Sequence, residues 1–209
     1  MATGIVLRTI SGLINDKETD PGVLVMDEKG KFVISLLSGH LGGANMGAEY
    51  VAGLTGATAV ITTATDVNGM VSPDMLAVKL GAVIDDMSIC KTVTAVMVNG
   101  GRVALLPYND MDIPHPYVSD AESADALVCI TNRIAEMRKA RSKGKPAVIL
   151  VPRNIVIGAG CRKGCEPSAL QGFIEEELNL LGIDRRAVGA VASIDIKTDE
   201  PAIRLAAEL

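Results

Sequence analysis

The densest group of residues that could do chemistry is the stretch 38–45, Ser-Gly-His-Leu-Gly-Gly-Ala-Asn, which lies between a strand pattern and a helix pattern. Its histidine, His40, is the residue type that exchanges protons near neutral pH. The glycines let backbone N–H groups approach a ligand, and the start of a helix favours anions. The stretch lacks the Gly-Lys-Ser/Thr ending of a phosphate loop and does not fit Gly-x-Gly-x-x-Gly. We expect a ligand-binding turn; the alternative is a tight turn whose histidine only caps or packs.

A second polar group, residues 62–69, follows the predicted buried strand 59–62. It reads Thr-Thr-Ala-Thr-Asp-Val-Asn-Gly, so several hydroxyls and the carboxylate of Asp66 leave the end of a strand together. Because ligands bind where the strands of α/β sheets end, this pattern suits a polar site beside the first turn. The alternative is a hydrogen-bonded turn in which Asn68 and Gly69 reverse the direction of the chain.

A third group, residues 158–165, follows a predicted strand and precedes a helix. Its Gly-x-Gly-x-x-x-Gly spacing weakly resembles a dinucleotide-binding turn, and Arg162 and Lys163 add affinity for anions. Cys161 and Cys165 have no neighbouring histidines that would complete a zinc site, so we expect structural thiols and no protein metal site. The basic run 133–145 is interpreted as a solvated helix face and loop.

Short apolar runs alternate with helical patterns along the chain, and they must position these groups. The runs 23–26 and 32–37 predict a hairpin, and helical spacing follows between residues 41 and 52. Ser-Pro-Asp at 72–74 is typical of a helix start. Further strands are expected at 103–106, 126–130, 147–151, 154–157 and 188–194, and further helices at 88–98 and 170–181. The alternation predicts an α/β fold with α/β/α layers.

The ends of the chain suggest a fragment. A helical pattern begins at once at the N-terminus, and a last helix that begins near residue 200 stops at Leu209 without a terminating signal. The segment 110–125, which holds two prolines and His115, suggests a connector. We therefore expect a chain that is cut at both ends.

Composition narrows the classes of function. The chain has 209 residues, a formal net charge of −5 and 48% hydrophobic residues, which is enough for a buried core. The acidic balance and the 2% aromatic content argue against a nucleic-acid binder. The apolar runs are too short to cross a bilayer, and the first residues lack the pattern of a secretory signal. Four cysteines are too few for a disulfide scaffold, so we expect a cytoplasmic protein with reduced thiols.

The motifs together resemble the CbiG family, the cobalt-precorrin-5A hydrolases of anaerobic cobalamin (vitamin B12) biosynthesis. The resemblance covers essentially the whole chain. It rests on residues 2–8 (Ala-Thr-Gly-Ile-Val-Leu-Arg), 16–17 (Asp-Lys) with 20–21 (Asp-Pro), 32–45, 61–66, 158–164 and 192–200. The long glycine-histidine stretch is its most specific part. Cys165 stands where a hydroxyl residue is common in the family.

The resemblance implies a domain organisation and a reaction. It implies a partial N-terminal domain at 1–109, a middle or linker region at 110–153, and the beginning of a C-terminal α/β domain at 154–209. The implied reaction opens a δ-lactone on a cobalt-bound, ring-contracted tetrapyrrole and releases acetaldehyde, giving cobalt-precorrin-5B. The cobalt belongs to the substrate, and no cofactor is implied. Other enzymes of the cobalamin pathway are expected partners, and nucleic acids and membranes are not.

Such a reaction needs an activated water and donors for a developing oxyanion. We expect His40 to be the base and Asp66 to orient it or to bind the water, with backbone N–H groups of Gly42 and Gly43 as oxyanion donors. Cations suit the carboxylates of the substrate. The expected substrate-binding residues are Ser38, Gly39, Gly42, Gly43, Asn45, Thr63, Thr65, Arg162 and Lys197. Two alternatives stay open: a protein that binds corrinoid intermediates without catalysis, and a nucleotide-dependent oxidoreductase suggested by residues 158–164.

Overall fold

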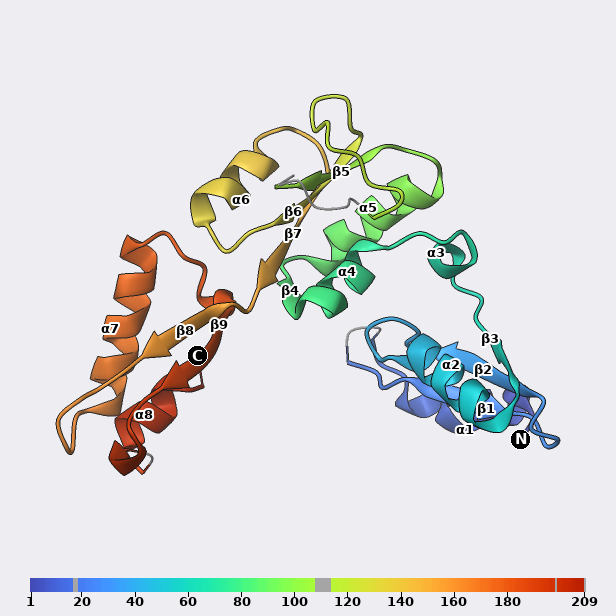
Figure 1. The fold of residues 1–209 in the computed structure, drawn as a ribbon, viewed down its shortest axis with the longest axis horizontal. Helices are drawn as coiled ribbons and strands as arrows, with labels where there is room; N and C mark the ends of the chain where they lie inside the picture. Colours follow the sequence, from blue (N-terminus) through green and yellow to red (C-terminus); the bar gives the residue numbers. More distant parts are fainter. Residues whose placement is uncertain (17–18, 108–113, 198, 209) are drawn as a thin grey trace. The chain divides into compact units, whose positions relative to one another are not determined.

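The structure is a computed structural model that describes residues 1–16, 19–107, 114–197 and 199–208. It divides into two compact units, Met1–Val78 and Lys79–Leu209, which we call unit 1 and unit 2 and describe separately (Figure 1). Both units combine helices with sheets, so the α/β class expected from the sequence is confirmed. In the described residues, no helix has both the length and the apolar character that crossing a membrane requires.

Unit 1 contains a three-stranded mixed sheet of order β1-β2-β3. Strands β1 and β2 form the expected antiparallel hairpin, whose turn is closed by a 2.7 Å hydrogen bond from the Phe32 N–H to Oδ1 of Asp27. Val33, Ala48 and Ala52 form a small buried core between the sheet and helix α2. The elements of unit 1 are α1 (Thr3–Ile10), η1 (Ser11–Leu13), β1 (Val23–Met26), β2 (Phe32–Leu37), α2 (Ala44–Thr55), β3 (Thr58–Val60), α3 (Ala64–Val67) and α4 (Pro73–Leu80), whose last two residues belong to unit 2.

The connection from β2 through α2 to β3 determines where polar groups can meet. Strands β2 and β3 are parallel neighbours, with Val33 opposite Ala59 and Ile34 opposite Val60. Parallel strands have their carboxyl ends at the same edge of a sheet. The turn at residues 38–43 and the segment after β3 therefore leave the sheet at the same edge.

Unit 2 is built on a four-stranded sheet of order β4-β7-β6-β5, in which β5, β6 and β7 are parallel and β4 is antiparallel. Leu127 and Ile149 pack with Met137 of helix α6, while helix α5 contacts the same strands, whose alternate residues Val128 and Val148 are also fully buried. The central strands are thus covered on both faces, as α/β/α layers require. The short strand β4 was not expected from the sequence. These elements are β4 (Ala82–Ile84), α5 (Met87–Val98), β5 (Val103–Leu106), β6 (Ala126–Ile130), α6 (Ile134–Arg141) and β7 (Ala147–Pro152).

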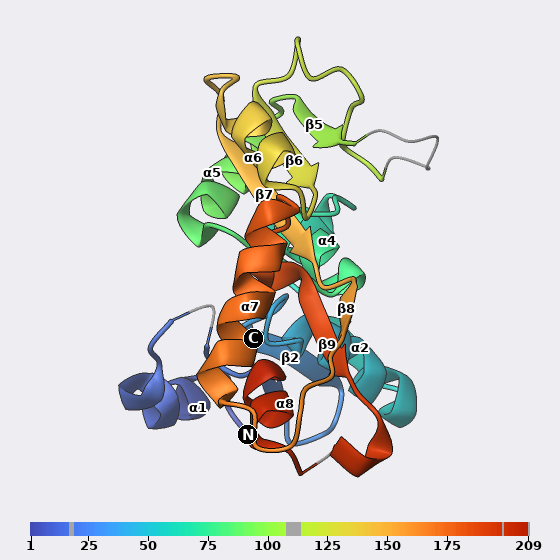
Figure 2. The same cartoon turned by 90° about the vertical axis from the view of Figure 1, so that its left-hand side faces the viewer.

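The rest of unit 2 is a two-stranded parallel sheet, β8-β9, with helices α7 and α8 that contact each other (Figure 2). The expected strand 188–194 ends at Ala192, because the chain turns into a 3₁₀ helix at Asp195. Helix α7 ends close to the C-terminal bound expected from the sequence, and Gly182 follows it in the left-handed conformation at φ 65°. The elements are β8 (Ile155–Gly158), α7 (Pro167–Leu180), η2 (Arg185–Ala187), β9 (Val188–Ala192), η3 (Asp195–Lys197) and α8 (Pro201–Ala206).

The domain boundaries expected from the sequence remain a prediction. The boundary between residues 109 and 110 lies outside the described residues. Strand β5, placed before that boundary, pairs in parallel with β6, placed after it. The segment 110–153, which was expected as a middle or linker region, contributes strands β6 and β7 to the sheet of unit 2.

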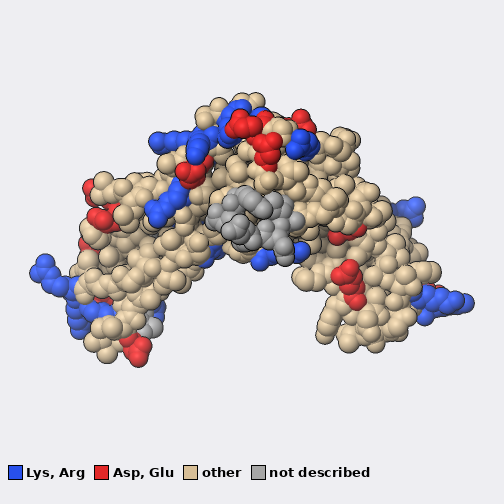
Figure 3. All heavy atoms as spheres, turned by 45° about the horizontal axis from the view of Figure 1, so that its top comes forward, with Lys and Arg blue, Asp and Glu red and all other residues tan. Residues whose placement is uncertain are grey.

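The basic run 133–145 forms α6 and the turn after it. Several of its cations have acidic partners: Arg141 pairs with Asp85, and Lys143 pairs with Glu122. Figure 3 shows Lys and Arg mixed with Asp and Glu on the face of the molecule in view. The run is therefore part of a mixed-charge surface, in keeping with its interpretation as a solvated helix face.

Candidate active site

The turn between β2 and α2 is closed by its own backbone. The N–H of Gly43 donates to the carbonyl of His40 at 3.0 Å, and the N–H groups of Ala44 and Asn45 donate to Ser38 and Gly39 at 3.2 and 2.9 Å. Ser38 and Gly43 both have positive φ angles, 52° and 76°. Because the Gly43 N–H is used inside the turn, this geometry does not support its expected role as an oxyanion donor.

The glycines of the turn make room for neighbouring backbone and side chains. A Cβ atom on Gly39 would lie 2.6 Å from Oδ1 of Asn45, and one on Gly42 would lie 2.7 Å from the backbone nitrogen of Gly22. Real Cβ atoms do not approach other atoms so closely. The sequence of small residues is thus what allows the turn to fold tightly and to hold His40 in place.

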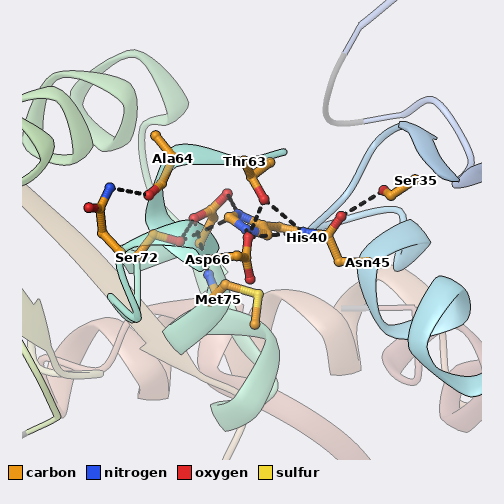
Figure 4. A network of polar contacts seen from close by, with 10 residues as sticks. Ser35, His40, Asn45, Thr63, Ala64, Asp66, Ser72 and Met75 are labelled. Atoms are coloured by element: carbon orange, nitrogen blue, oxygen red, sulfur yellow. Dashed lines mark hydrogen bonds and ion pairs between the residues drawn. The ribbon is translucent and has the colours of Figure 1, made fainter. Parts of the chain in front are cut away.

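His40 lies buried between two carboxylates (Figure 4), with 8% of its surface exposed. Its Nε2 atom is 2.7 Å from Oδ2 of Asp66, and its Nδ1 atom is 3.0 Å from Oδ2 of Asp74. A carboxylate only accepts hydrogen bonds, so both ring nitrogens can be satisfied only when both carry protons. The geometry therefore favours an imidazolium ion, and it does not support the expected role of His40 as a base.

The electrostatics of the ring agree with this geometry. The hydrogen bond to Asp74 raises the pKa of His40, burial opposes it, and the hydrogen bond to Asp66 adds to the increase, so that the pKa lies above its ordinary value of 6.5. An imidazolium between two carboxylates is stabilised at neutral pH.

Three donors converge on one oxygen of Asp66. Its Oδ2 atom accepts hydrogen bonds from His40, from Nδ2 of Asn45 at 3.0 Å and from the hydroxyl of Thr63. Partial burial alone would raise the pKa of Asp66, but the hydrogen bonds from Thr63 and His40 hold it below 3.8. Within the described part of the chain, Oδ1 receives no donor from another residue, and 28% of the side chain is exposed. Asp66 is thus an ionised carboxylate with one oxygen fixed and the other available.

Asn45 links the sheet to this cluster. Its Oδ1 atom accepts a hydrogen bond from the hydroxyl of Ser35 at 2.6 Å, and its Nδ2 atom donates to Thr63 at 3.0 Å as well as to Asp66. The amide is buried, with 6% exposed. Residues from β2, α2 and the segment after β3 therefore share one hydrogen-bond network, and the prediction that the two polar groups lie close together is confirmed.

Asp74 is the member of the cluster that the sequence did not indicate as a functional residue. It lies in the Ser-Pro-Asp stretch, whose sequence indicates only a helix start, and that helix, α4, does begin at Pro73. Its Oδ1 atom accepts hydrogen bonds from the hydroxyl of Ser72 and from the N–H of Met75 at 3.1 Å. No local sequence pattern links it to His40, which lies 34 positions earlier.

Other expected site residues lie outside the polar network. Thr65 is 96% buried, and its carbonyl accepts a hydrogen bond from the N–H of Met70 at 2.8 Å. Ser38 is buried, and its hydroxyl has no hydrogen-bond partner among the described residues. Arg162 and Lys197 belong to unit 2, where Nζ of Lys197 donates to the carbonyl of Cys161 at 2.8 Å. Lys197 therefore supports the loop around Cys161.

The loop 160–165 lines a cavity of about 550 Å³ in unit 2. Arg162 and Lys163 line it together with Cys161, Cys165 and Phe173. This surface combines two cations with an aromatic ring, which suits a partly apolar anion. Among the described residues, no group of three or more His, Cys, Asp or Glu side chains is arranged to hold a metal ion.

The fold and the site together define an α/β protein with a carboxylate–imidazole–carboxylate cluster beside the ends of two parallel strands. Three protein-family models match successive parts of the chain: cobalamin synthesis G N-terminal at residues 1–66, cobalamin biosynthesis central region at 71–152 and cobalamin synthesis G C-terminus at 155–209. The chain belongs to this cobalamin synthesis G family, CbiG, which confirms the resemblance noted in the sequence.

Curated relatives agree with the family assignment. A cobalt-precorrin-5A hydrolase from Salmonella typhimurium is 38% identical over 216 residues, covering 97% of this chain and 60% of that protein. A cobalt-precorrin-5A hydrolase from Priestia megaterium is 31% identical over 215 residues, covering 96% and 57%. A solved structure of a cobalamin biosynthesis protein G homolog from Sulfolobus solfataricus has a TM-score of 0.49 and 22% identity, covering 98% of this chain and 60% of that one.

The chain spans about three fifths of the length of the curated relatives it matches. The expected truncation at both ends is not supported by these matches, which extend over nearly the whole chain, and it stays a prediction.

The packing around Gly42 gives a prediction on stability. Gly42→Ala should lower the free energy of unfolding of unit 1 by about 1–3 kcal/mol, because the new methyl group meets backbone atoms that cannot easily move. The matched control is Gly53→Ala in helix α2, where a Cβ meets nothing within 4 Å, and it should stabilise the helix by about 0.5–1 kcal/mol. Urea unfolding followed by circular dichroism measures both. Equal effects of the two substitutions would refute the proposed crowding at Gly42.

The charge state of His40 gives a prediction on pH dependence. Since its pKa is raised by folding, the stability that it contributes is fully present below pH 6.5 and is lost as the pH rises through the folded-state pKa. The Asp66 contribution has the opposite sign: it is present above pH 3.8 and is lost as the pH falls through the lowered pKa. The difference in unfolding free energy between wild type and His40→Gln should therefore be larger at about pH 5 than at about pH 9.

Urea unfolding at the two pH values tests this, with His115→Gln, which changes the other histidine of the chain, as the control. Each variant removes one imidazole, so the comparison isolates what depends on the place of His40. A His40→Gln effect that grows toward alkaline pH contradicts the assignment of His40 as a cation.

Proposed function

We propose that the chain acts in the hydrolysis of cobalt-precorrin-5A, opening the δ-lactone of the cobalt-bound macrocycle and releasing acetaldehyde. The observation that carries this proposal is the match of nearly the whole chain, at 38% identity, to a cobalt-precorrin-5A hydrolase. The expected cytoplasmic location and the expected partners among enzymes of the pathway stay predictions.

The chemistry consumes one water. The water oxygen adds to the lactone carbonyl, the bond from this carbonyl to the ring oxygen breaks, and a carboxylic acid and an alcohol result. The alcohol carbon then becomes the aldehyde carbon as its bond to the macrocycle breaks, the hydroxyl proton is lost and the macrocycle takes the electron pair and a proton. The first step requires a group that accepts a proton from the attacking water.

Asp66 is our candidate for this acceptor. It is ionised at neutral pH because its pKa is lowered, and the convergence of three donors on Oδ2 leaves Oδ1 available for a water molecule. A low pKa makes a weak base, so the contribution of Asp66 lies in its fixed orientation as much as in its basicity. In this proposal His40, Asn45 and Thr63 hold the carboxylate, and His40 also places positive charge near the developing oxyanion.

The turn residues have supporting roles in the proposal. Gly39 and Gly42 permit the close packing that brings His40 to Asp66. The N–H of Gly42 remains our candidate for oxyanion stabilisation, whereas Ser38 and Thr65 are proposed to shape the surrounding structure from their buried positions.

Within unit 2, Arg162 and Lys163 are proposed to form an anion-binding surface that suits the carboxylates of a tetrapyrrole. Both line the cavity of unit 2 beside Phe173, a residue that is 59% exposed and offers an apolar contact. This proposal keeps the sequence-based role of Arg162 and transfers that of Lys197 to Lys163, because Nζ of Lys197 already donates to the carbonyl of Cys161.

The first prediction from this proposal concerns Asp66. Incubation of the chain with cobalt-precorrin-5A under anaerobic conditions should release one acetaldehyde per substrate, and Asp66→Asn should lower turnover about 10²- to 10⁴-fold, because the amide cannot accept the proton. Acetaldehyde is measured after trapping as a hydrazone, and binding is followed through the absorbance of the corrinoid. Asp120→Asn, which changes a carboxylate in unit 2, should retain full turnover.

Two outcomes would overturn parts of the proposal. Undiminished turnover of Asp66→Asn removes Asp66 from the mechanism. Binding of the corrinoid by the wild-type chain without acetaldehyde release favours the alternative of a non-catalytic binding protein.

The second prediction concerns the cavity of unit 2. The double variant Arg162→Gln/Lys163→Gln should raise KM by about 10-fold or more with little change in kcat, because a charge-assisted hydrogen bond contributes about 1.5–3 kcal/mol to binding. The matched control is Arg138→Gln/Lys139→Gln on helix α6, which removes the same charge from exposed positions of the same unit. If both double variants change KM equally, only overall charge matters and the cavity is not a binding site.

A further inference from the structure

Asp74 is a carboxylate whose burial requires explanation. Only 3% of the residue is exposed, and an ion removed from water costs several kcal/mol unless it is paired and hydrogen-bonded. Both of its oxygens have partners: Oδ2 faces Nδ1 of His40 at 3.0 Å, and Oδ1 accepts from Ser72 and from the Met75 N–H. The carboxylate is therefore fixed in orientation as well as in position.

The start of helix α4 provides this rigidity. Pro73 is the first residue of the helix, and Asp74 follows it in the first turn, where the helix dipole favours a negative charge. Leu76 and Ala77 of the same helix are buried, with 8% and 2% of their surface exposed.

Asp74 and His40, which it contacts, are matched by different family models. The N-terminal family model matches residues 1–66, which include His40 and Asp66, and the central-region model begins at residue 71. The cluster is thus completed by a residue that the central-region model matches, although all its members lie within unit 1.

We propose that Asp74 is a positioning residue of the hydrolytic site: through Nδ1 it keeps His40 oriented and protonated, so that Nε2–H donates to Oδ2 of Asp66 and leaves Oδ1 for the reacting water. This inference rests on the proposed function for its catalytic consequence. Its structural part, the control of His40 by Asp74, stands on the contacts alone.

The charge balance explains why the ring needs a second carboxylate. Without Asp74, Nδ1 would face only the uncharged hydroxyl of Ser72, 3.4 Å away, in a buried place where a neutral ring is favoured. A neutral ring protonated on Nδ1 would present the Nε2 lone pair to the Asp66 carboxylate, and the two acceptors would repel each other. With Asp74 at Nδ1 and Asp66 at Nε2, either neutral tautomer leaves one ring lone pair facing a carboxylate, so only the doubly protonated ring satisfies both contacts. Of the described charged groups, those facing the ring are Asp66 from α3 and Asp74 from α4.

The test begins with the ring itself. The chain has two histidines, so the ¹H–¹⁵N correlations of their rings are few, and His115→Gln assigns the His40 signals. In Asp74→Asn the titration midpoint of His40 should fall by about one pH unit or more, because an opposite charge within hydrogen-bonding distance is removed. Ser72→Ala keeps the charge of Asp74 but removes one donor to it and a hydroxyl 3.4 Å from Nδ1 of His40, so it should shift the midpoint less.

The kinetic arm separates positioning from a merely structural role. Asp74→Asn should lower kcat for acetaldehyde release about 10- to 100-fold with KM nearly unchanged, because Asp66 loses its orientation while the substrate contacts remain. Asp86→Asn is the matched control, since Asp86 caps helix α5 by accepting from the Ile89 N–H at 3.0 Å and contacts no histidine in the described structure. It should change neither the His40 titration nor kcat.

The outcomes are distinguishable. An unchanged His40 titration in both Asp74→Asn and Ser72→Ala overturns the inference, whatever the activity. A shifted titration with unchanged kcat overturns the positioning role. A wild-type chain that releases no acetaldehyde contradicts the proposed function, whereas the titration still decides whether Asp74 controls His40. If Asp74→Asn does not fold, Ser72→Ala carries both measurements.

Discussion

The burial of an imidazole ring between two carboxylates is the interaction on which the candidate site depends. Each charge in the set Asp66, His40 and Asp74 is stable in its place because of the others: the ring remains protonated because both nitrogens face carboxylates, and Asp66 remains ionised with the help of the ring and of Thr63. A buried charge that loses its partner is strongly destabilised. The three charges therefore depend on one another, and the local backbone must place all three side chains within hydrogen-bonding distance.

Two parallel strands, a glycine-containing turn and the start of a helix place these three side chains. The parallel pair β2 and β3 brings the turn of His40 and the segment of Asp66 to one edge of the sheet, and helix α2 between them fixes their separation. Glycines at 39 and 42 let the turn pack against Asn45 and Gly22, so that the ring enters the interior. Helix α4 then adds Asp74. The order of the strands, the close packing of the turn and the pairing of the charges together determine the positions of these three side chains.

The sequence predicted the hairpin, most helices and the nearness of the two polar groups, because these depend on periodicity, turn residues and the rule for parallel strands. It did not predict the role of Asp74, since Ser-Pro-Asp has a sufficient local explanation as a helix start and nothing local links it to a residue 34 positions away. It also assigned His40 as a base. Only the three-dimensional contacts show that both ring nitrogens of His40 have hydrogen-bond partners, because the positions of residues in the sequence do not give the distances between their atoms.

The charge state of His40 changes which residue can act on water. An imidazolium has no lone pair to accept a proton, so in the proposed reaction the accepting group must be a carboxylate, and Asp66 alone combines an available oxygen with partial exposure in this cluster. The lowered pKa of Asp66 applies to the free protein, in which the carboxylate is partly exposed to water. A bound substrate that shields the cluster from bulk solvent, with one water left on Oδ1, makes the carboxylate a stronger base, while the imidazolium keeps it ionised until the proton is transferred. The pairing that weakens Asp66 as a base before binding thus maintains its reactive form once the substrate covers it.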